Sequence, residues 1–222
     1  MSKNNTENKS VNKTVLLPEQ RGIIDKAVVM FSANKKVFAV LVIAVLAAAI
    51  GFAAYSHNQQ KAYQDQWAGL FKAELNFVSD QNSLAPLENF VEANPATDAA
   101  IYARLTLGNA YYQTQDYVKA QEYFKQVASG KNKELAALAE VSSVATDVAQ
   151  KDYAGAIKAA DAFIAKNPTH FAMGEVLQYK ALAQELSGDA KSAKESYTKI
   201  SMQYPQTYYS AFADMRLKEL NK

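Results

Sequence analysis

Cysteine is absent from the 222-residue sequence, and histidine, tryptophan and proline are scarce, with two, one and five residues. Without cysteine the chain forms no disulfide, uses no thiolate nucleophile and binds no metal through sulfur. The histidines, His57 and His170, lie more than 100 positions apart, and a solvated or capping role explains each better than a metal pair or a general base. Nucleotide-binding loops, nucleophile elbows and zinc-protease motifs are also missing. The sequence therefore predicts a protein that is not an enzyme and has no cofactor, and an unrecognised enzyme is the remotest alternative.

Charge is unevenly distributed along the chain. Residues 1–36 have a net charge of +4, and the remaining residues have a net charge of −2. No block is basic enough for a phosphate-binding footprint, which argues against nucleic-acid binding. The expected partners are proteins, with no small-molecule substrate.

One long apolar run, residues 37–55 (VFAVLVIAVLAAAIGFAAY), contains neither a charge nor a proline. As a helix it would span roughly 28 Å, close to the hydrocarbon thickness of a bilayer, so we expect a transmembrane helix. A buried core helix is one alternative, but such helices rarely run this long without a polar residue. A cleaved signal peptide is another, because small residues precede Tyr55, although its apolar region usually has only about 7–15 residues.

The charges beside this run predict its orientation. Lys35 and Lys36 precede it, whereas no Lys or Arg follows it before Lys61. The positive-inside rule then places the N-terminus in the cytoplasm and residues 56–222 outside, which in a bacterium is the periplasmic or extracytoplasmic side of the inner membrane. Residues 1–16 are expected to be a disordered cytoplasmic tail, and residues 17–36 a juxtamembrane segment.

A repeat follows the apolar run. QDYVKAQEYFKQV, KDYAGAIKAADAF and GDAKSAKESYTKI align so that Asp116, Asp152 and Asp189 are 36 and 37 residues apart. The spacing is close to the 34-residue tetratricopeptide unit, and each Asp is expected to form a turn and cap a helix. A small residue follows each Asp after four positions, where two helices can approach closely. These residues are Ala120, Ala156 and Ala193. Terminating prolines follow the pattern at Pro95, Pro168 and Pro205.

The predicted fold is all-α, with one transmembrane helix followed by a tetratricopeptide-like α-solenoid over residues 59–222. It comprises three to four helical hairpins plus a C-terminal capping helix. The third hairpin departs from the pattern, since Val144 and Asp147 replace the Gly108 and Tyr111 of the second. A generic helical bundle with chance spacing is the alternative. The expected helices are 60–79, 84–93, 97–114, 117–129, 133–150, 153–165, 170–187, 190–203 and 206–220.

In such arrays the first helix of each hairpin lines a concave face that binds a peptide or a partner helix. Only Asn109 fits the set of Lys, Arg and Asn that would clamp a terminal carboxylate, so we expect an aromatic and apolar groove for extended or unfolded segments. The predicted contact residues are Tyr102, Leu105, Asn109, Tyr112, Leu138, Val141, Ala145 and Gln178.

The tail, anchor and divergent repeats resemble the bacterial tetratricopeptide-like family of the ancillary SecYEG translocon subunit (YfgM-like), over residues 30–222. The segment GFAAYSHNQQKAYQDQWAGLF, where the anchor runs into the first soluble helix, is similar in character to that family. The resemblance implies a periplasmic chaperone-like or ancillary subunit whose partners are membrane or secreted clients, with SecYEG among the candidates. The longer polar N-terminal tail departs from the family.

The alternative function is a self-associating scaffold of an envelope assembly complex. Small side chains along the anchor, at Ala44, Ala47, Ala48 and Gly51, would allow one helix to pack against another.

Overall fold

The computed structural model describes residues 22, 25–26, 28–29, 32, 34–79 and 83–222. The expected tail 1–16 lies outside the described residues, as does most of the expected juxtamembrane segment 17–36. All regular structure in the described part of the chain is helical, which confirms the predicted all-α class. The chain divides into two compact units, Met1–Lys61 and Ala62–Lys222.

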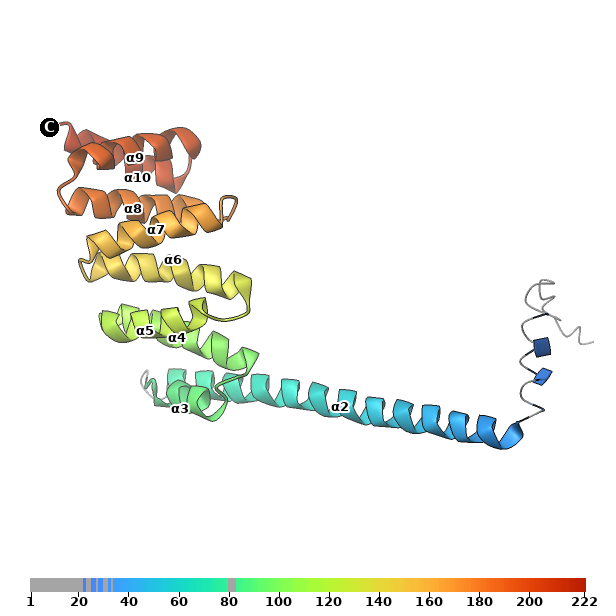
Figure 1. The fold of residues 1–222 in the computed structure, drawn as a ribbon. Helices are drawn as coiled ribbons and strands as arrows, with labels where there is room; N and C mark the ends of the chain where they lie inside the picture. The colour runs from blue at the N-terminus through green and yellow to red at the C-terminus, as the bar shows by residue number, and fades with distance from the viewer. Residues whose placement is uncertain (1–21, 23–24, 27, 30–31, 33, 80–82) are drawn as a thin grey trace, which may run out of the picture. The chain divides into compact units, whose positions relative to one another are not determined.

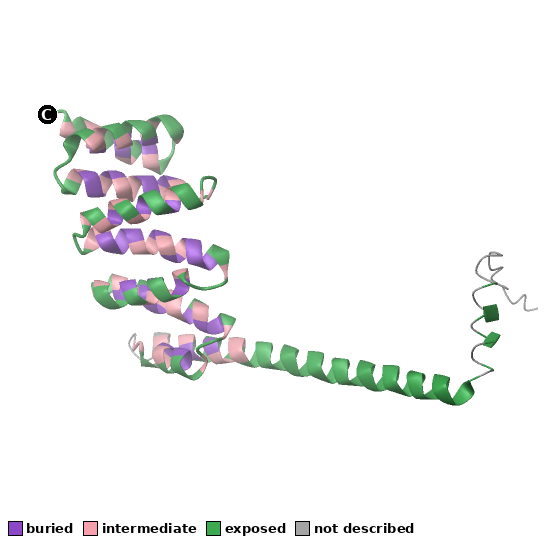
Figure 2. Ribbon diagram, in the orientation of Figure 1, coloured by how far each residue is buried: buried purple, intermediate pink, exposed green. Residues whose placement is uncertain are grey.

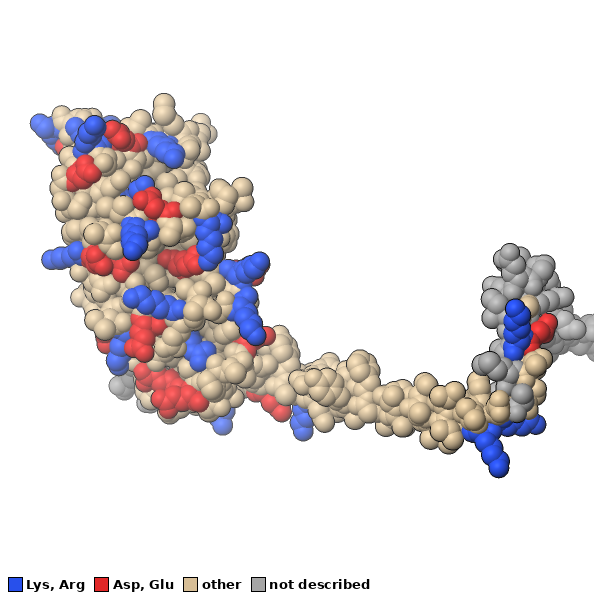
Figure 3. All heavy atoms as spheres, in the orientation of Figure 1, with Lys and Arg blue, Asp and Glu red and all other residues tan. Residues whose placement is uncertain are grey.

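The described part of the first unit consists mainly of the N-terminal portion of helix α2 (Lys35–Ser79). Every side chain from residue 34 to residue 61 is exposed, and the apolar stretch of the helix has a mean hydropathy of 2.8. Figure 3 shows this stretch of the helix in tan, without charged side chains. The helix is long and apolar enough to cross a bilayer, which makes it a candidate membrane span.

Helix α2 continues without a break into the second unit, so the expected apolar helix and the expected helix 60–79 are one element. The further helices are α3 (Ala85–Ala93), α4 (Asp98–Gln113), α5 (Tyr117–Ala128), α6 (Lys133–Ala149), α7 (Tyr153–Lys166), α8 (Met173–Leu186), α9 (Ala190–Gln203) and α10 (Tyr208–Leu220).

Successive helices of the second unit stack as hairpins (Figure 1). The pairs are residues 62–79 of α2 with α3, then α4 with α5, α6 with α7, and α8 with α9, and α10 closes the stack. In the described residues each of helices α3 to α10 packs mainly against helices one or two places away in chain order. This is the nearest-neighbour packing of a helical solenoid.

The three aligned aspartates form the turns inside the last three hairpins. Asp116, Asp152 and Asp189 each accept a hydrogen bond of 2.9–3.2 Å from the backbone N–H three residues later, and so cap α5, α7 and α9. The residue before each aspartate has a positive φ, which tightens the turn. These residues are Gln115, Lys151 and Gly188. The predicted turn-and-cap role of the aspartates is therefore confirmed.

Two helices start two or more residues later than predicted. Helix α8 begins at Met173 rather than near residue 170, because the backbone N–H of Ala172 donates to Nδ1 of His170 in the preceding turn at 3.2 Å. Helix α10 begins at Tyr208 rather than 206, because Gln206 has a positive φ and Thr207 caps the helix.

The core lies between the paired helices, where Figure 2 shows the buried residues. Ala120, Ala156 and Ala193 are completely buried, as expected for positions of close helix approach. The helices α4 and α5 come so close that a Cβ on Gly108 would lie 2.6 Å from the ring of Phe124. Glycine is therefore needed at this position to make room for the aromatic ring.

Candidate binding groove on the first helices of the hairpins

A groove lies over the first helices of the last three hairpins. Helix α6 packs between α4 and α8. The groove on these three helices, to which Phe124 of α5 also contributes, has a volume of about 180 Å³. We call it the tyrosine groove. Its lining residues are Asn109, Tyr112, Gln113, Phe124, Ser142, Ala145, Glu175 and Tyr179.

Three of the eight predicted contact residues line this groove, namely Asn109, Tyr112 and Ala145. Tyr102 lies elsewhere on α4, 40% exposed, and its ring packs edge-on against Trp67 at 5.1 Å. The structure thus places predicted contact residues both in the groove and beside Trp67.

The other four predicted contact residues do not line the groove. Leu105 and Leu138 are half-buried against the core cluster that extends from the first hairpin to α6. Val141 is only 4% exposed and belongs to the next core cluster. Gln178 is half-buried, and its Oε1 accepts no hydrogen bond from the described residues.

Five lining residues were not predicted, and the repeat spacing would have found some of them. Glu175 lies 37 residues after Leu138, so it occupies the same position of its hairpin as a predicted contact residue. Tyr179 lies 37 residues after Ser142, and both line the groove. Gln113 and Phe124 carry no such signal.

Two polar lining residues of the groove are hydrogen-bonded to each other. The Tyr179 hydroxyl donates to Oε1 of Glu175 at 3.2 Å. The Tyr112 ring packs edge-on against Tyr117, with centroids 5.6 Å apart. The two tyrosine rings of the groove, on α4 and α8, thus come from different hairpins, and the carboxylate-bearing Glu175 lines the same groove.

Burial raises the pKa of the Tyr112 hydroxyl, and the neighbouring Tyr117 adds to this effect. Burial also raises the pKa of the Tyr179 hydroxyl, and the negative charge of Glu175 reinforces the shift. Both hydroxyls therefore stay protonated at physiological pH. Glu175 is the only lining residue with an ionisable carboxylate, and none is cationic.

The cationic side chains of α4 and α8, Arg104 and Lys180, have partners outside the groove. Nη2 of Arg104 donates to the backbone carbonyl of Pro95 at 2.9 Å. Nζ of Lys180 forms an ion pair with Asp161 of α7 at 2.6 Å. The groove is therefore lined by one carboxylate, that of Glu175, and by no cationic residue.

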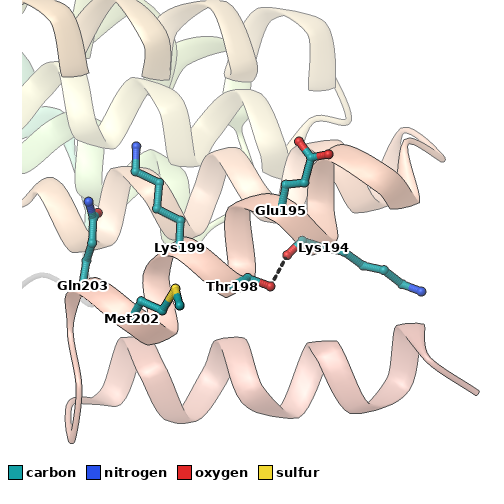
Figure 4. A pocket seen from close by; sticks show the side chains of 6 residues that line it. All are labelled: Lys194, Glu195, Thr198, Lys199, Met202 and Gln203. Atoms are coloured by element: carbon teal, nitrogen blue, oxygen red, sulfur yellow. Dashed lines mark hydrogen bonds between the residues drawn. The ribbon is translucent and has the colours of Figure 1, made fainter.

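A larger hollow on α9, of about 560 Å³, has a different character (Figure 4). All its lining residues come from this one helix. They are Lys194, Glu195, Thr198, Lys199, Met202 and Gln203. Lys199 and Gln203 extend to the same side of the helix. This surface lacks walls from a second element and mixes both charge signs.

The residues that suggested chemistry have structural roles. His170 accepts the turn hydrogen bond described above, and its ring packs edge-on against Phe163, with centroids 5.3 Å apart. The aspartates of the repeat cap helices. Among the described residues, no group of three or more His, Asp or Glu is placed to hold a metal ion.

Comparisons with known proteins agree with this architecture. A family model described as a tetratricopeptide repeat-like domain matches residues 30–172. The chain is also similar to a solution NMR structure of the second TPR domain of human RPAP3 in complex with the HSP70 peptide SGPTIEEVD. That similarity has 16% identity and a TM-score of 0.44, covering 55% of this chain and 98% of that one, which is too weak to indicate what this chain binds. No curated protein matches the chain. The family model covers more than half of the sequence, so the predicted repeat fold is confirmed and the chain belongs to the tetratricopeptide repeat-like domain family.

Proposed function

We propose that this protein is a membrane-tethered protein–protein interaction module that binds an extended segment of a partner in the tyrosine groove. The groove is the observation that carries the proposal, because three consecutive hairpins contribute to one partly enclosed surface. Repeat arrays present extended surfaces of this kind to peptides and helices. The protein would act by binding rather than catalysis, since the aspartates and His170 that suggested chemistry stabilise turns.

We further propose that α2 anchors the repeat domain on the periplasmic side of the inner membrane, as a chaperone-like or ancillary subunit near the Sec translocon. The apolar stretch of α2 and the cations Lys35 and Lys36 before it support this orientation. Tethering confines the search for a membrane partner to a plane and raises its effective concentration, so weak contacts suffice.

Site-specific photo-crosslinking in cells tests the binding surface. A photoreactive phenylalanine at Gln113 would lie in the groove, whereas the same residue at Thr198 would lie on the open face of α9 as a control. We expect adducts with other envelope proteins, recovered after detergent extraction, from Gln113 and not from Thr198. Equal yields from both positions, or none from Gln113, would contradict the proposal. Adducts between copies of this chain alone would favour the self-associating scaffold instead.

Protease accessibility tests the orientation. The repeat domain should resist protease in intact cells and be digested once the outer membrane is permeabilised and the inner membrane is still closed. Protection until the inner membrane is also broken would place the domain in the cytoplasm, and both the topology and the secretion-related role would then be wrong.

A further inference from the structure

The size of the tyrosine groove limits what can enter it. Pockets for small molecules and cofactors commonly measure about 300–1,000 Å³, whereas this one measures about 180 Å³. It has room for one side chain of a longer ligand rather than for a compact ligand. The rest of such a ligand would run across the neighbouring hairpins, where exposed Asn109 and Gln113 offer amide groups to a peptide backbone.

The charge of the groove determines whether the bound side chain should be positively or negatively charged. Glu175 supplies the only formal charge among the lining residues. The cations of α4 and α8, Arg104 and Lys180, bind Pro95 and Asp161 instead. A carboxylate entering the groove would meet like charge with no compensating cation. A cation would be attracted to Glu175 and also to the faces of the neutral tyrosine rings.

We propose that the tyrosine groove binds a single arginine side chain presented by an extended segment of a partner protein. The inference rests on the proposed function and specifies the partner's chemistry at that same site. The guanidinium stacks against Tyr112 or Tyr179 and donates hydrogen bonds to the carboxylate of Glu175. Arginine fits better than lysine because its planar, weakly hydrated group both stacks on aromatic rings and donates in a fork to a carboxylate.

Matched peptides test the proposal on the full-length chain in nanodiscs. One dye-labelled peptide has a Gly/Ser backbone with a central Leu-Arg-Leu, and a second replaces the arginine by citrulline, which keeps the shape and removes the charge. Fluorescence anisotropy gives the Kd of each. We expect the arginine peptide to bind about tenfold more tightly than the citrulline peptide, lysine to give an intermediate Kd, and glutamate to bind no better than citrulline. The preference should shrink as NaCl is raised.

Two carboxylate variants locate the effect. Glu175→Gln should abolish most of the difference between arginine and citrulline. Glu195→Gln removes an exposed carboxylate from α9, outside the groove, and should leave the difference unchanged. Far-UV circular dichroism confirms that both variants remain folded.

The outcomes separate this inference from the proposed function. Equal Kd values for arginine and citrulline in the unaltered protein, or an arginine preference that survives Glu175→Gln, would overturn the arginine site. Groove-specific crosslinks would still support the interaction module in that case. The absence of both peptide binding and groove-specific crosslinks would overturn the two proposals together.

Discussion

The second and third hairpins place large and small side chains in opposite order. In the second, α4 contributes Gly108 and α5 contributes Phe124, whose ring occupies the space that a Cβ would need. In the third, Val144 of α6 and Ala160 of α7 take the same two positions of the repeat, 36 residues later, and both are fully buried. The two hairpins differ in which helix supplies the larger side chain, and a larger residue on one helix faces a smaller one on the other, as close packing requires. The departure at Val144 is therefore matched by a smaller residue, Ala160, in the same core cluster.

The largest effect should come from removing the aromatic ring of the second hairpin. Phe124→Ala leaves a cavity beside Gly108, and it should lower the free energy of unfolding by about 3–5 kcal/mol. Hydrogen exchange of the full-length chain in detergent, followed by mass spectrometry, should show the loss first in α4 and α5. The control Val118→Ala lies on the same helix but is 76% exposed, so it should change stability by less than about 0.5 kcal/mol. Similar losses from both variants would refute the packing argument.

Filling the position of the glycine should be the next most harmful change. Gly108→Val forces side-chain atoms into the ring of Phe124 and should cost about 1–3 kcal/mol. The double variant Gly108→Val with Phe124→Ala copies the pair found in the third hairpin. The free energy of unfolding that the double variant loses, measured with urea, should be smaller than the sum of the losses in the two single variants. Strict additivity would mean that the two positions do not share one volume.

Removing one helix cap should lower stability less than the two core substitutions do, and by a similar amount in the second and third hairpins. Asp116→Ala and Asp152→Ala each leave the first turn of the following helix without its side-chain acceptor, at a cost of about 1 kcal/mol. Asp152→Asn should retain most of the stability, because asparagine also caps helices. A Tm that falls as far with asparagine as with alanine would show that the charge rather than the hydrogen bond matters.

The smallest expected effect concerns two acidic residues, Asp147 near the C-terminal end of α6 and Glu185 near that of α8. Burial raises the pKa of Asp147, although Oδ1 accepts hydrogen bonds from Gln121 at 2.8 Å and from Gln150 at 3.1 Å. Burial also disfavours the charge on Glu185, but hydrogen bonds from Arg216 and Tyr197 outweigh it, and the pKa is lowered.

The two shifts have opposite consequences for stability. With a raised pKa, Asp147 stabilises the fold below its unfolded pKa of about 3.9, and this contribution is lost as pH rises through the folded pKa. Glu185 contributes above its unfolded pKa of about 4.3, and its contribution is lost as pH falls. Asp147→Asn should therefore gain Tm relative to the unaltered chain between pH 4 and pH 7. Glu185→Gln should lose Tm over the same range. Parallel Tm curves for the unaltered chain and either variant would contradict the assigned shift.

The fold was largely predictable because its signals are local. Each of the last three hairpins has an aspartate that caps its second helix and a small residue where the helices approach, and both recur at a nearly fixed spacing. Positions that depend on the twist between hairpins were harder to predict. Val141 was expected on the contact face but is 4% exposed, whereas Tyr179 lies in the groove and was not foreseen. Sequence spacing fixes which residues are equivalent, and the rotation of one hairpin against the next decides which of them face outward.

Because helices α3 to α10 pack mainly against near neighbours in the chain, the repeat array can bend and twist between adjacent hairpins. Small rotations between adjacent hairpins add up along the stack while each hairpin keeps its own core. The tyrosine groove spans three such hairpins, so its width depends on the rotation of each hairpin relative to the next. A pull or a twist applied to the array would change how tightly the groove holds a ligand before any helix unfolds.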